Sequence, residues 1–235
     1  MKFSNFFYIL ILLLLQAAAW SQCLTGSSGY FSIPSGEIGK DRSFFAGVHM
    51  LNKEYSQLWE TNRDIQAMFA TVTFLPFMEV SLRFSRPYRL YSTTGDRMAI
   101  LRFKVCAEGK YRPAIVLGLQ GFLSTISGSD GPSYFNSTYL VATKNIKVHK
   151  IIETLGLNLG YGSDVIKAHT HQFIGVFGGI RLVPEHVKWM ELFVEYDADK
   201  TNAGMRVTVL KHFVILGGFE GLKAPSAGVS YKMML

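Results

Sequence analysis

Cysteine, charge and long hydrophobic segments are all scarce in this sequence. Only two of its 235 residues are cysteine, which excludes a disulfide-built scaffold. Cys23 and Cys106 could form one bridge at most, and the sequence leaves open whether they do. Charged residues make up 17% of the chain. The apolar run Phe6–Leu15 is shorter than the roughly 20 residues that a membrane-spanning helix needs, so it does not suit such a helix.

The apolar run is better explained as part of an N-terminal export signal. Lys2 precedes it, and the small residues Ala19 and Ser21 follow it, which is the arrangement of a secretory signal peptide. We expect cleavage after Ser21, with Ala19 as the other possible position and an uncleaved anchor as the alternative. Residues 1–21 contain one basic residue and no acid, so cleavage lowers the formal charge from +7 by one, to +6.

The remaining basic excess does not indicate a nucleic-acid partner. Lysine and arginine number 24 against 17 acids, but the basic residues are scattered through alternating segments. There is no basic helix and no stripe of mixed aromatic and basic residues, which are the usual features of a nucleic-acid surface. We therefore expect no nucleic-acid partner for this exported protein.

The charges that are present alternate with apolar residues. In Trp189–Val209 the first half is apolar on one parity and acidic on the other, and the second half sets apolar residues against Gly204, Arg206 and Thr208. A period of two indicates two strands, each with one apolar and one polar face. The polar linker Ala198–Asn202 predicts a hairpin turn between them.

The same period recurs along the chain, and no segment after the signal is a confident helix. Each expected strand has about ten residues, the length that a tilted strand needs to cross a bilayer. The segments are roughly Ser43–Asn52, Ile65–Leu75, Phe77–Ser85, Arg97–Cys106, Ala114–Phe122, Phe135–Lys144, Ile152–Gly162, Gln172–Val183, Trp189–Asp197, Ala203–Leu210, His212–Gly221 and Ala227–Leu235.

The polar faces distinguish between two architectures. One face of most strands carries large apolar residues, and the other mixes glycine, serine and asparagine with charges of both signs. Three segments are apolar on both faces in places: Ser43–Asn52, Gln172–Val183 and His212–Gly221. Small inward residues suit a narrow closed barrel, and closure satisfies every strand edge, as lipid requires. We therefore predict a single antiparallel transmembrane β-barrel of about 12 strands, with a periplasmic sandwich as the alternative. The residues expected to face lipid are Met78, Val80, Leu82, Leu157, Leu159, Val194, Tyr196, Val207, Val229 and Tyr231.

The charged residues on the opposite parity are the candidate functional site. One interpretation makes them a path for a polysaccharide or an ion, and the other makes them a salt-bridged core that fills a narrow barrel. Carboxylates alone do not define a glycosidase, which needs two of them at a set separation beside a sugar groove. The candidate lumen charge network is Glu79, Arg83, Arg102, Lys104, Glu191, Glu195, Asp197, Arg206 and Lys232.

Other motifs give no sign of catalysis. His169 and His171 lack a third ligand for a metal. The sequence has no Gly-x-Ser-x-Gly elbow for a nucleophilic serine, and Gly156-x-x-x-Gly160 is not followed by the helix of a phosphate loop. We expect no catalytic residue, no metal and no cofactor.

Several stretches resemble the YjbH family, whose members are outer-membrane barrels linked to exopolysaccharide production. These stretches are the glycine-rich start Gly26–Asp41, the paired strands Asp96–Val105, Gly109–Phe122 and Tyr139–Lys144, and the acidic strand Glu195–Asp197 followed by Asn202–Arg206. The resemblance implies that this chain is also an outer-membrane barrel linked to exopolysaccharide production. Gly121 stands where the family pattern has an acid, and this chain forms one short barrel whereas some relatives are longer and lipidated.

The expected organisation is a signal peptide over residues 1–21, an N-terminal periplasmic segment over 22–42 and an outer-membrane barrel over 43–235. We expect a non-enzymatic protein of the Gram-negative outer membrane, accessory to the export or organisation of exopolysaccharide. Its expected partners are outer-membrane lipid, polysaccharide and other envelope proteins. The alternatives are a small diffusion pore and, with less support, a lipid-modifying enzyme.

Overall fold

The computed structural model describes residues 22–54, 63–89, 95–124, 136–148, 151–165 and 172–235. The expected signal peptide and the pair His169 and His171 lie outside these residues. In the described part of the chain, no helix is long and apolar enough to cross a membrane.

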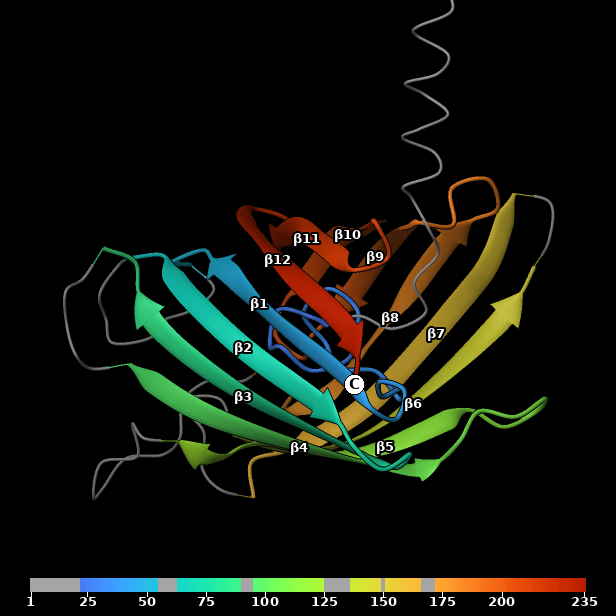
Figure 1. Ribbon diagram of the computed structural model, residues 1–235, viewed down its shortest axis with the longest axis horizontal. Coiled ribbons are helices and arrows are strands. Elements are labelled where there is room, and N and C mark those ends of the chain that lie inside the picture. Colours follow the sequence, from blue (N-terminus) through green and yellow to red (C-terminus); the bar gives the residue numbers. More distant parts are fainter. Residues whose placement is uncertain (1–21, 55–62, 90–94, 125–135, 149–150, 166–171) are drawn as a thin grey trace, which may run out of the picture.

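Twelve antiparallel strands form one closed barrel, in which each strand pairs with its neighbours in the sequence (Figure 1). The strands are β1 Ser43–Leu51, β2 Ile65–Thr73, β3 Met78–Pro87, β4 Asp96–Cys106, β5 Ala114–Ser124, β6 Ser137–Lys147, β7 Ile152–Ser163, β8 Gly175–Pro184, β9 Met190–Tyr196, β10 Thr201–Val209, β11 Phe213–Glu220 and β12 Ala224–Met234.

The barrel is closed by pairing between its first and last strands. Ser43 of β1 lies opposite Met234 of β12, and the register continues to Met50 opposite Ala227. Each of the twelve described strands pairs with a neighbour on both sides, so they form neither a sandwich nor an open sheet. The predicted all-β class and the barrel of about 12 strands are confirmed.

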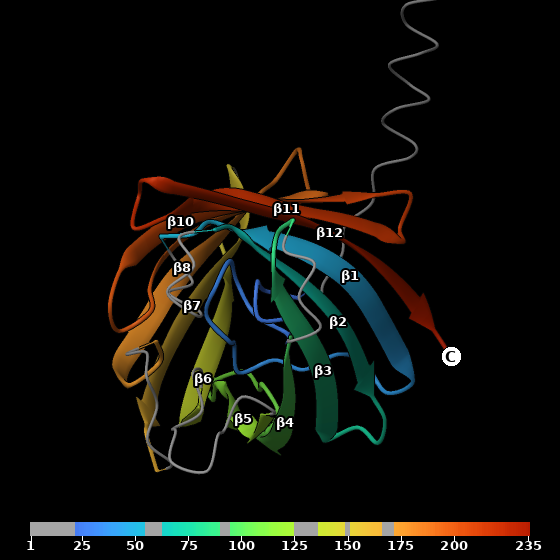
Figure 2. The ribbon, with the colours of Figure 1, turned by 90° about the vertical axis from the view of Figure 1, so that its left-hand side faces the viewer.

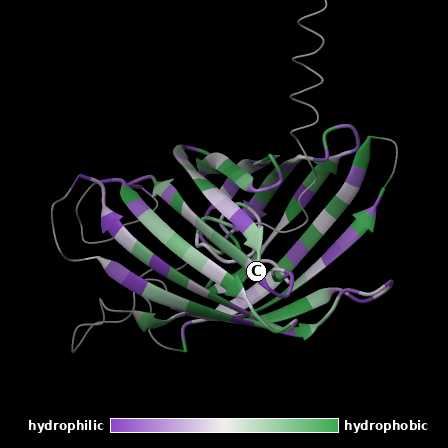
Figure 3. Ribbon diagram, in the orientation of Figure 1, coloured by the Kyte–Doolittle hydropathy of each residue, from purple (hydrophilic) through white to green (hydrophobic). Residues whose placement is uncertain are grey.

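Apolar and polar residues alternate along the strands because their side chains point to opposite sides of the wall (Figure 3). In β9, Leu192, Val194 and Tyr196 are exposed on the outside, whereas Glu191 and Glu195 are buried inside. The ten residues expected on the lipid face are all exposed or half-buried. The sequence parity therefore gives the two faces correctly.

The two ends of the barrel differ in their connections. The strand ends that the connections 74–77, 107–113, 148–151, 185–189 and 210–212 join lie at one end, which we name the tight-turn end. The strand ends that the longer connections 52–64, 88–95, 125–136 and 164–174 join lie at the other, the long-loop end, together with the short turns 197–200 and 221–223. The start of β1 and the end of β12 both lie at the tight-turn end.

The segment before β1 lies inside the barrel. Residues 22–39, which we name the plug, are buried apart from the half-buried Glu37, and only residues 40–42 emerge at the tight-turn end. Figure 2 shows this segment, in blue, enclosed by the strands. The stretch expected to form a periplasmic segment, 22–42, is thus largely part of the barrel interior.

Candidate functional site

The plug is a compact chain of turns. Cys23 donates its backbone N–H to the carbonyl of Ser27, and Tyr30 donates to the carbonyl of Ile33, which closes two successive turns. Gly26 has a φ of 91°, a conformation that favours glycine. Cys23 is a buried free thiol and Cys106 is a half-buried one, so the two cysteines do not pair.

Apolar side chains of the plug complete a core inside the barrel. Leu24, Tyr30, Phe31 and Ile33 are buried and cluster with inward residues of the wall such as Phe193. The rings of Tyr30 and Phe193 stack with centroids 5.5 Å apart. Burial raises the pKa of the Tyr30 phenol above its ordinary value, although Arg181 opposes the shift, so the phenol stays neutral.

Two glycines of the wall make room for Phe31. Gly204 of β10 and Gly218 of β11 lie opposite each other in the register. A Cβ at Gly204 would lie 2.6 Å from the Phe31 ring, and one at Gly218 would lie 2.8 Å from the tip of that ring. The plug therefore requires a glycine at 204, whereas the one at 218 is also required by the backbone of β10, whose Ala203 carbonyl would clash with a Cβ there.

Glu195 of β9 fastens the middle of the plug. Its carboxylate accepts hydrogen bonds from the backbone N–H groups of Phe31 at 3.0 Å, Ser32 at 2.7 Å and Ile33 at 3.3 Å, and from the Ser32 hydroxyl. Asn202 donates to the same hydroxyl at 2.9 Å. A buried carboxylate satisfied in this way holds three consecutive residues in place.

Glu79 of β3 and Arg102 of β4 form a second fastening. They make a fully buried ion pair of 2.8 Å. Glu79 also accepts from the Ser28 N–H at 2.9 Å, from the Ser28 hydroxyl and from the Gly39 N–H at 3.1 Å. The Arg102 guanidinium donates to the carbonyls of Ser35 and Glu37. This pair therefore binds both donors and acceptors of the plug backbone.

Arg206 of β10 forms the third fastening. It pairs with Glu191 at 2.8 Å and donates to the plug carbonyls of Gln22 at 3.2 Å, Gly29 at 2.7 Å and Tyr30 at 2.5 Å. One guanidinium thus holds three carbonyls that would otherwise lie unsatisfied inside the wall.

A polar cluster surrounds the plug near the tight-turn end. Arg181 of β8 lies 3.3 Å from Glu37 and donates to the side chain of Asn145 at 2.7 Å. Asn145 donates to Glu37 and to Glu108. Partial burial works to raise the pKa of the Glu108 carboxyl, but hydrogen bonds from Asn145 and Lys144 outweigh it and hold that pKa below its ordinary value.

Most of the predicted charge network therefore holds the plug. Glu79, Arg102, Glu195 and Arg206 bond to it directly, and Glu191 bonds to Arg206.

The other four predicted residues lie at the margins of this arrangement. Asp197 accepts from the turn residue Lys200 at 2.7 Å and from Asn202 at 3.1 Å. Arg83 is buried and donates to Ser85 of its own strand. Lys104 lies at the tight-turn end, where it donates to the carbonyl of Pro76, and Lys232 is half-buried at the same end of β12.

Sequence reasoning missed the plug and three side chains that serve it. Arg181 has the inward parity of β8, but its segment is apolar on both faces in places, which hid the pattern. Asn202 falls at the end of a turn, and Glu37 lies in a stretch with no period. The one sequence feature that could have identified Arg181 as an inward residue is its position beside the strand glycines Gly178 and Gly179.

The polar side chains of the barrel interior hold the plug in place. In the part of the chain that the structure describes, no group of three His, Cys, Asp or Glu residues could hold a metal ion. Glu79 and Glu195 are each occupied by backbone N–H groups of the plug.

A family model described as exopolysaccharide biosynthesis protein YbjH matches residues 21–231. No curated protein matches the chain. The matched span includes the whole plug as well as nearly all of the barrel, so both parts lie within the same family pattern.

Proposed function

The chain belongs to the YjbH family of exopolysaccharide biosynthesis proteins, and from this premise we propose that it is a non-enzymatic outer-membrane barrel that assists the export or organisation of an exopolysaccharide. The plug closes its lumen at rest. Lipid is the partner of its outer wall, and polysaccharide or another envelope protein is the partner of its ends.

The outer wall supports the membrane placement. Large apolar residues face outward from all twelve strands, and the inward faces carry most of the charge. A soluble protein of this size would bury those residues and expose the charges. A barrel in lipid requires the opposite arrangement, together with closed strand edges.

The observation that carries the accessory role is the attachment of the plug at three places by buried charges. An open diffusion pore needs a water-filled lumen, and this lumen is filled by residues 22–39. The fastening residues come from β3, β4, β9 and β10, so the plug contacts opposite parts of the wall. These contacts support a closed barrel over a porin.

The test is deletion of the gene from the producing bacterium, followed by complementation. We expect secreted polysaccharide to fall and the wild-type gene to restore it. The protein should fractionate with the outer membrane and migrate faster on a gel without heating than after heating. Unchanged polymer in the deletion strain, or recovery of the protein in the soluble fraction, would contradict the proposal.

A further inference from the structure

The outward face of the barrel carries arginine in one place. Among the outward positions of the twelve described strands, the only arginines are Arg86 near the end of β3 and Arg97 near the start of β4. Both are exposed and lie at the long-loop end. An arginine that faces lipid is costly at mid-depth and much less so near the headgroups, so this position suits an interface.

The residues below these arginines form graded rows across the wall. Nearest the long loops, Gln66 lies opposite Arg86, and Arg86 donates to the Gln66 side chain at 3.0 Å. The next row towards mid-barrel is Met68, Phe84 and Arg97. Polarity thus decreases in steps from the rim towards the middle of the barrel.

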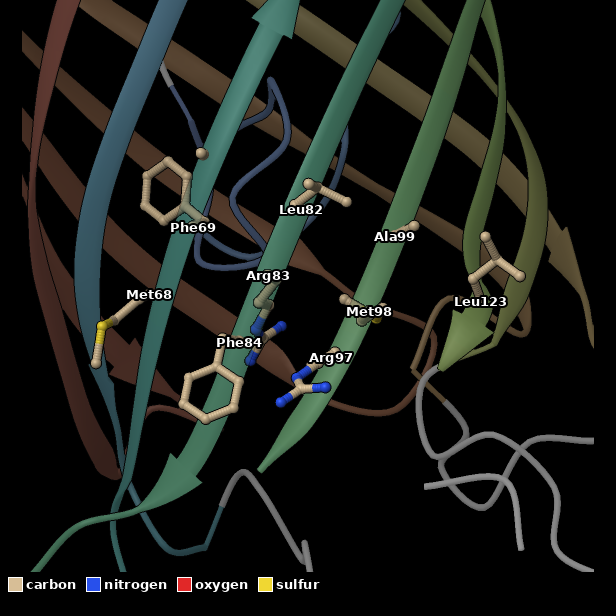
Figure 4. Close-up of a pocket in the computed structure, with 10 residues that line it drawn as sticks. Met68, Phe69, Leu82, Arg83, Phe84, Arg97, Met98, Ala99 and Leu123 are labelled. Carbon is tan, nitrogen blue, oxygen red and sulfur yellow. The ribbon is translucent and has the colours of Figure 1, made fainter. Parts of the chain in front are cut away.

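The third row makes a groove. Ala70, Leu82, Ala99 and Leu123 lie side by side on β2 to β5, so small and large side chains alternate across the wall. With the Met68, Phe84 and Arg97 row above, they line a hollow of about 810 Å³, to which the inward residues Phe69, Arg83 and Met98 also contribute. Figure 4 shows Leu82, Phe84 and Leu123 around it, with Arg97 near the ends of the strands.

More positive charge lies above the groove. Arg63 and Arg89 are exposed just before β2 and just after β3, and Arg63 donates to the Arg89 carbonyl at 3.3 Å. Arg89 lies over the Tyr88 ring at 5.3 Å. Tyrosine and arginine together are typical of a membrane interface, where an aromatic body meets a polar headgroup.

We propose that the β2–β5 wall binds one phosphorylated, multiply acylated glycolipid of the outer leaflet, because the long-loop end of an outer-membrane barrel lies on the extracellular side. Its acyl chains lie in the groove over Ala70 and Ala99, and its phosphates lie against Arg86 and Arg97. This inference rests on the proposed outer-membrane placement and adds a specific lipid to it.

The arrangement favours this lipid over other ligands. A free phosphate would have no use for the apolar rows below the arginines, and a zwitterionic phospholipid carries no net charge to match them. A glycolipid with several chains fills a broad groove, and guanidinium groups bind phosphate oxygens in pairs. From the rim towards mid-barrel, the two rows that carry Arg86 and Arg97 precede the apolar row of Ala70, Leu82, Ala99 and Leu123, which is the order of phosphates and acyl chains in such a lipid.

The test is native mass spectrometry of the full mature chain, purified in neutral detergent and titrated with bisphosphorylated lipid A. Arg86→Gln combined with Arg97→Gln should weaken binding at least about tenfold, because charge-assisted hydrogen bonds to the phosphates are lost. Ala99→Leu should fill the groove and weaken binding to a similar degree. Heat-modifiable gel migration checks that each variant is folded.

Matched controls remove two positive charges, or enlarge an alanine, elsewhere on the barrel. Arg112→Gln combined with Lys147→Gln removes two exposed charges at the tight-turn end, and Ala203→Leu enlarges an outward alanine between Val194 and Phe219 at the long-loop end. Both should bind like the wild type.

Three results would overturn the proposed site: equal binding by the arginine variant, equal binding of phosphatidylethanolamine, or complete competition by inorganic phosphate. Because binding is measured on purified protein, it is independent of the polysaccharide assay. Binding with unchanged polymer secretion in the deletion strain would reject the proposed function alone.

Discussion

Glu195 shows how one buried carboxylate helps to hold the plug inside the lumen. Its carboxylate has no cationic partner among the contacts described above and is satisfied by backbone N–H groups of Phe31, Ser32 and Ile33. Such a carboxylate is stable only while those donors stay in place, and the donors are satisfied only while it does. The acid and the segment therefore depend on each other.

Replacing Glu195 by alanine should loosen the plug without opening the barrel wall. The loss of hydrogen bonds to a charged group costs about 1.5–3 kcal/mol each, so several buried donors left unpaired will favour release. Cys23, which is fully buried, reports the change. In a Cys106→Ser background, a maleimide should label Cys23 quickly in Glu195→Ala and slowly in the parent.

The control for that experiment is Val194→Ala, which changes the outward neighbour of Glu195 on the same strand. Labelling should stay slow there, because Val194 does not contact the plug face. Slow labelling of folded Glu195→Ala would show that the carboxylate does not retain the segment.

At the scale of elements, the strands follow from local sequence and the plug does not. Period two sets the faces of β9 and β10 within the strands themselves, so Glu191 and Arg206 could be assigned inward without coordinates. The plug has no period, and its partners are remote: Ser32 meets Glu195 from 163 residues away. Only the closed barrel creates the surface on which this segment folds.

An irregularity in the pairing of β4 with β5 explains why Lys104 lies apart from the rest of the predicted charge network. Lys104 has the inward parity, but the register of β4 against β5 shifts between Lys104 and Cys106. The strand is ending there beside the connection 74–77, and the ammonium reaches the Pro76 carbonyl. Parity gives the side of the wall, but it does not give the depth along the lumen.

Deleting residues 22–39 should convert the barrel into a conducting pore. The deletion removes the apolar side chains that fill the lumen and leaves Glu79, Arg102, Glu195 and Arg206 facing water. In a planar bilayer, we expect steady single-channel current from the deletion variant and little from the full mature chain. Current from the full chain equal to that of the variant would favour the porin alternative.

At the scale of the whole molecule, the outer wall of the barrel and its interior differ in polarity. The outer wall is apolar, and the interior holds buried charges around the apolar core that the plug completes, whereas an ordinary globular protein keeps its charges on the surface. The overall class was predictable because most strands set large apolar residues on one face and small or charged residues on the other. The closed lumen was not, because composition alone does not distinguish a solvated interior from one filled by residues 22–39.

The two surfaces predict opposite tolerance to charge. Leu157→Arg, at an outward position midway along β7 that is 41% exposed, should destabilise a lipid-embedded barrel by about 2–4 kcal/mol. The measurement is urea unfolding in lipid vesicles. Tyr111→Arg, in the connection 107–113, should change the free energy of unfolding by less than about 0.5 kcal/mol. Equal effects of the two substitutions would contradict the assignment of the outer wall to lipid.

The pairing of β1 with β12 also has a consequence for biogenesis. The wall cannot become continuous until the final strand reaches the first, so every earlier stage has two unsatisfied borders that invite misassociation. The plug directly precedes β1 and is held by β3 and β4, which are synthesised early, and by β9 and β10, which are synthesised late. Its binding surface is therefore complete only near the end of synthesis, so a chain stalled before β12 would leave both the first and the last strand edge unpaired and the plug without an enclosing wall.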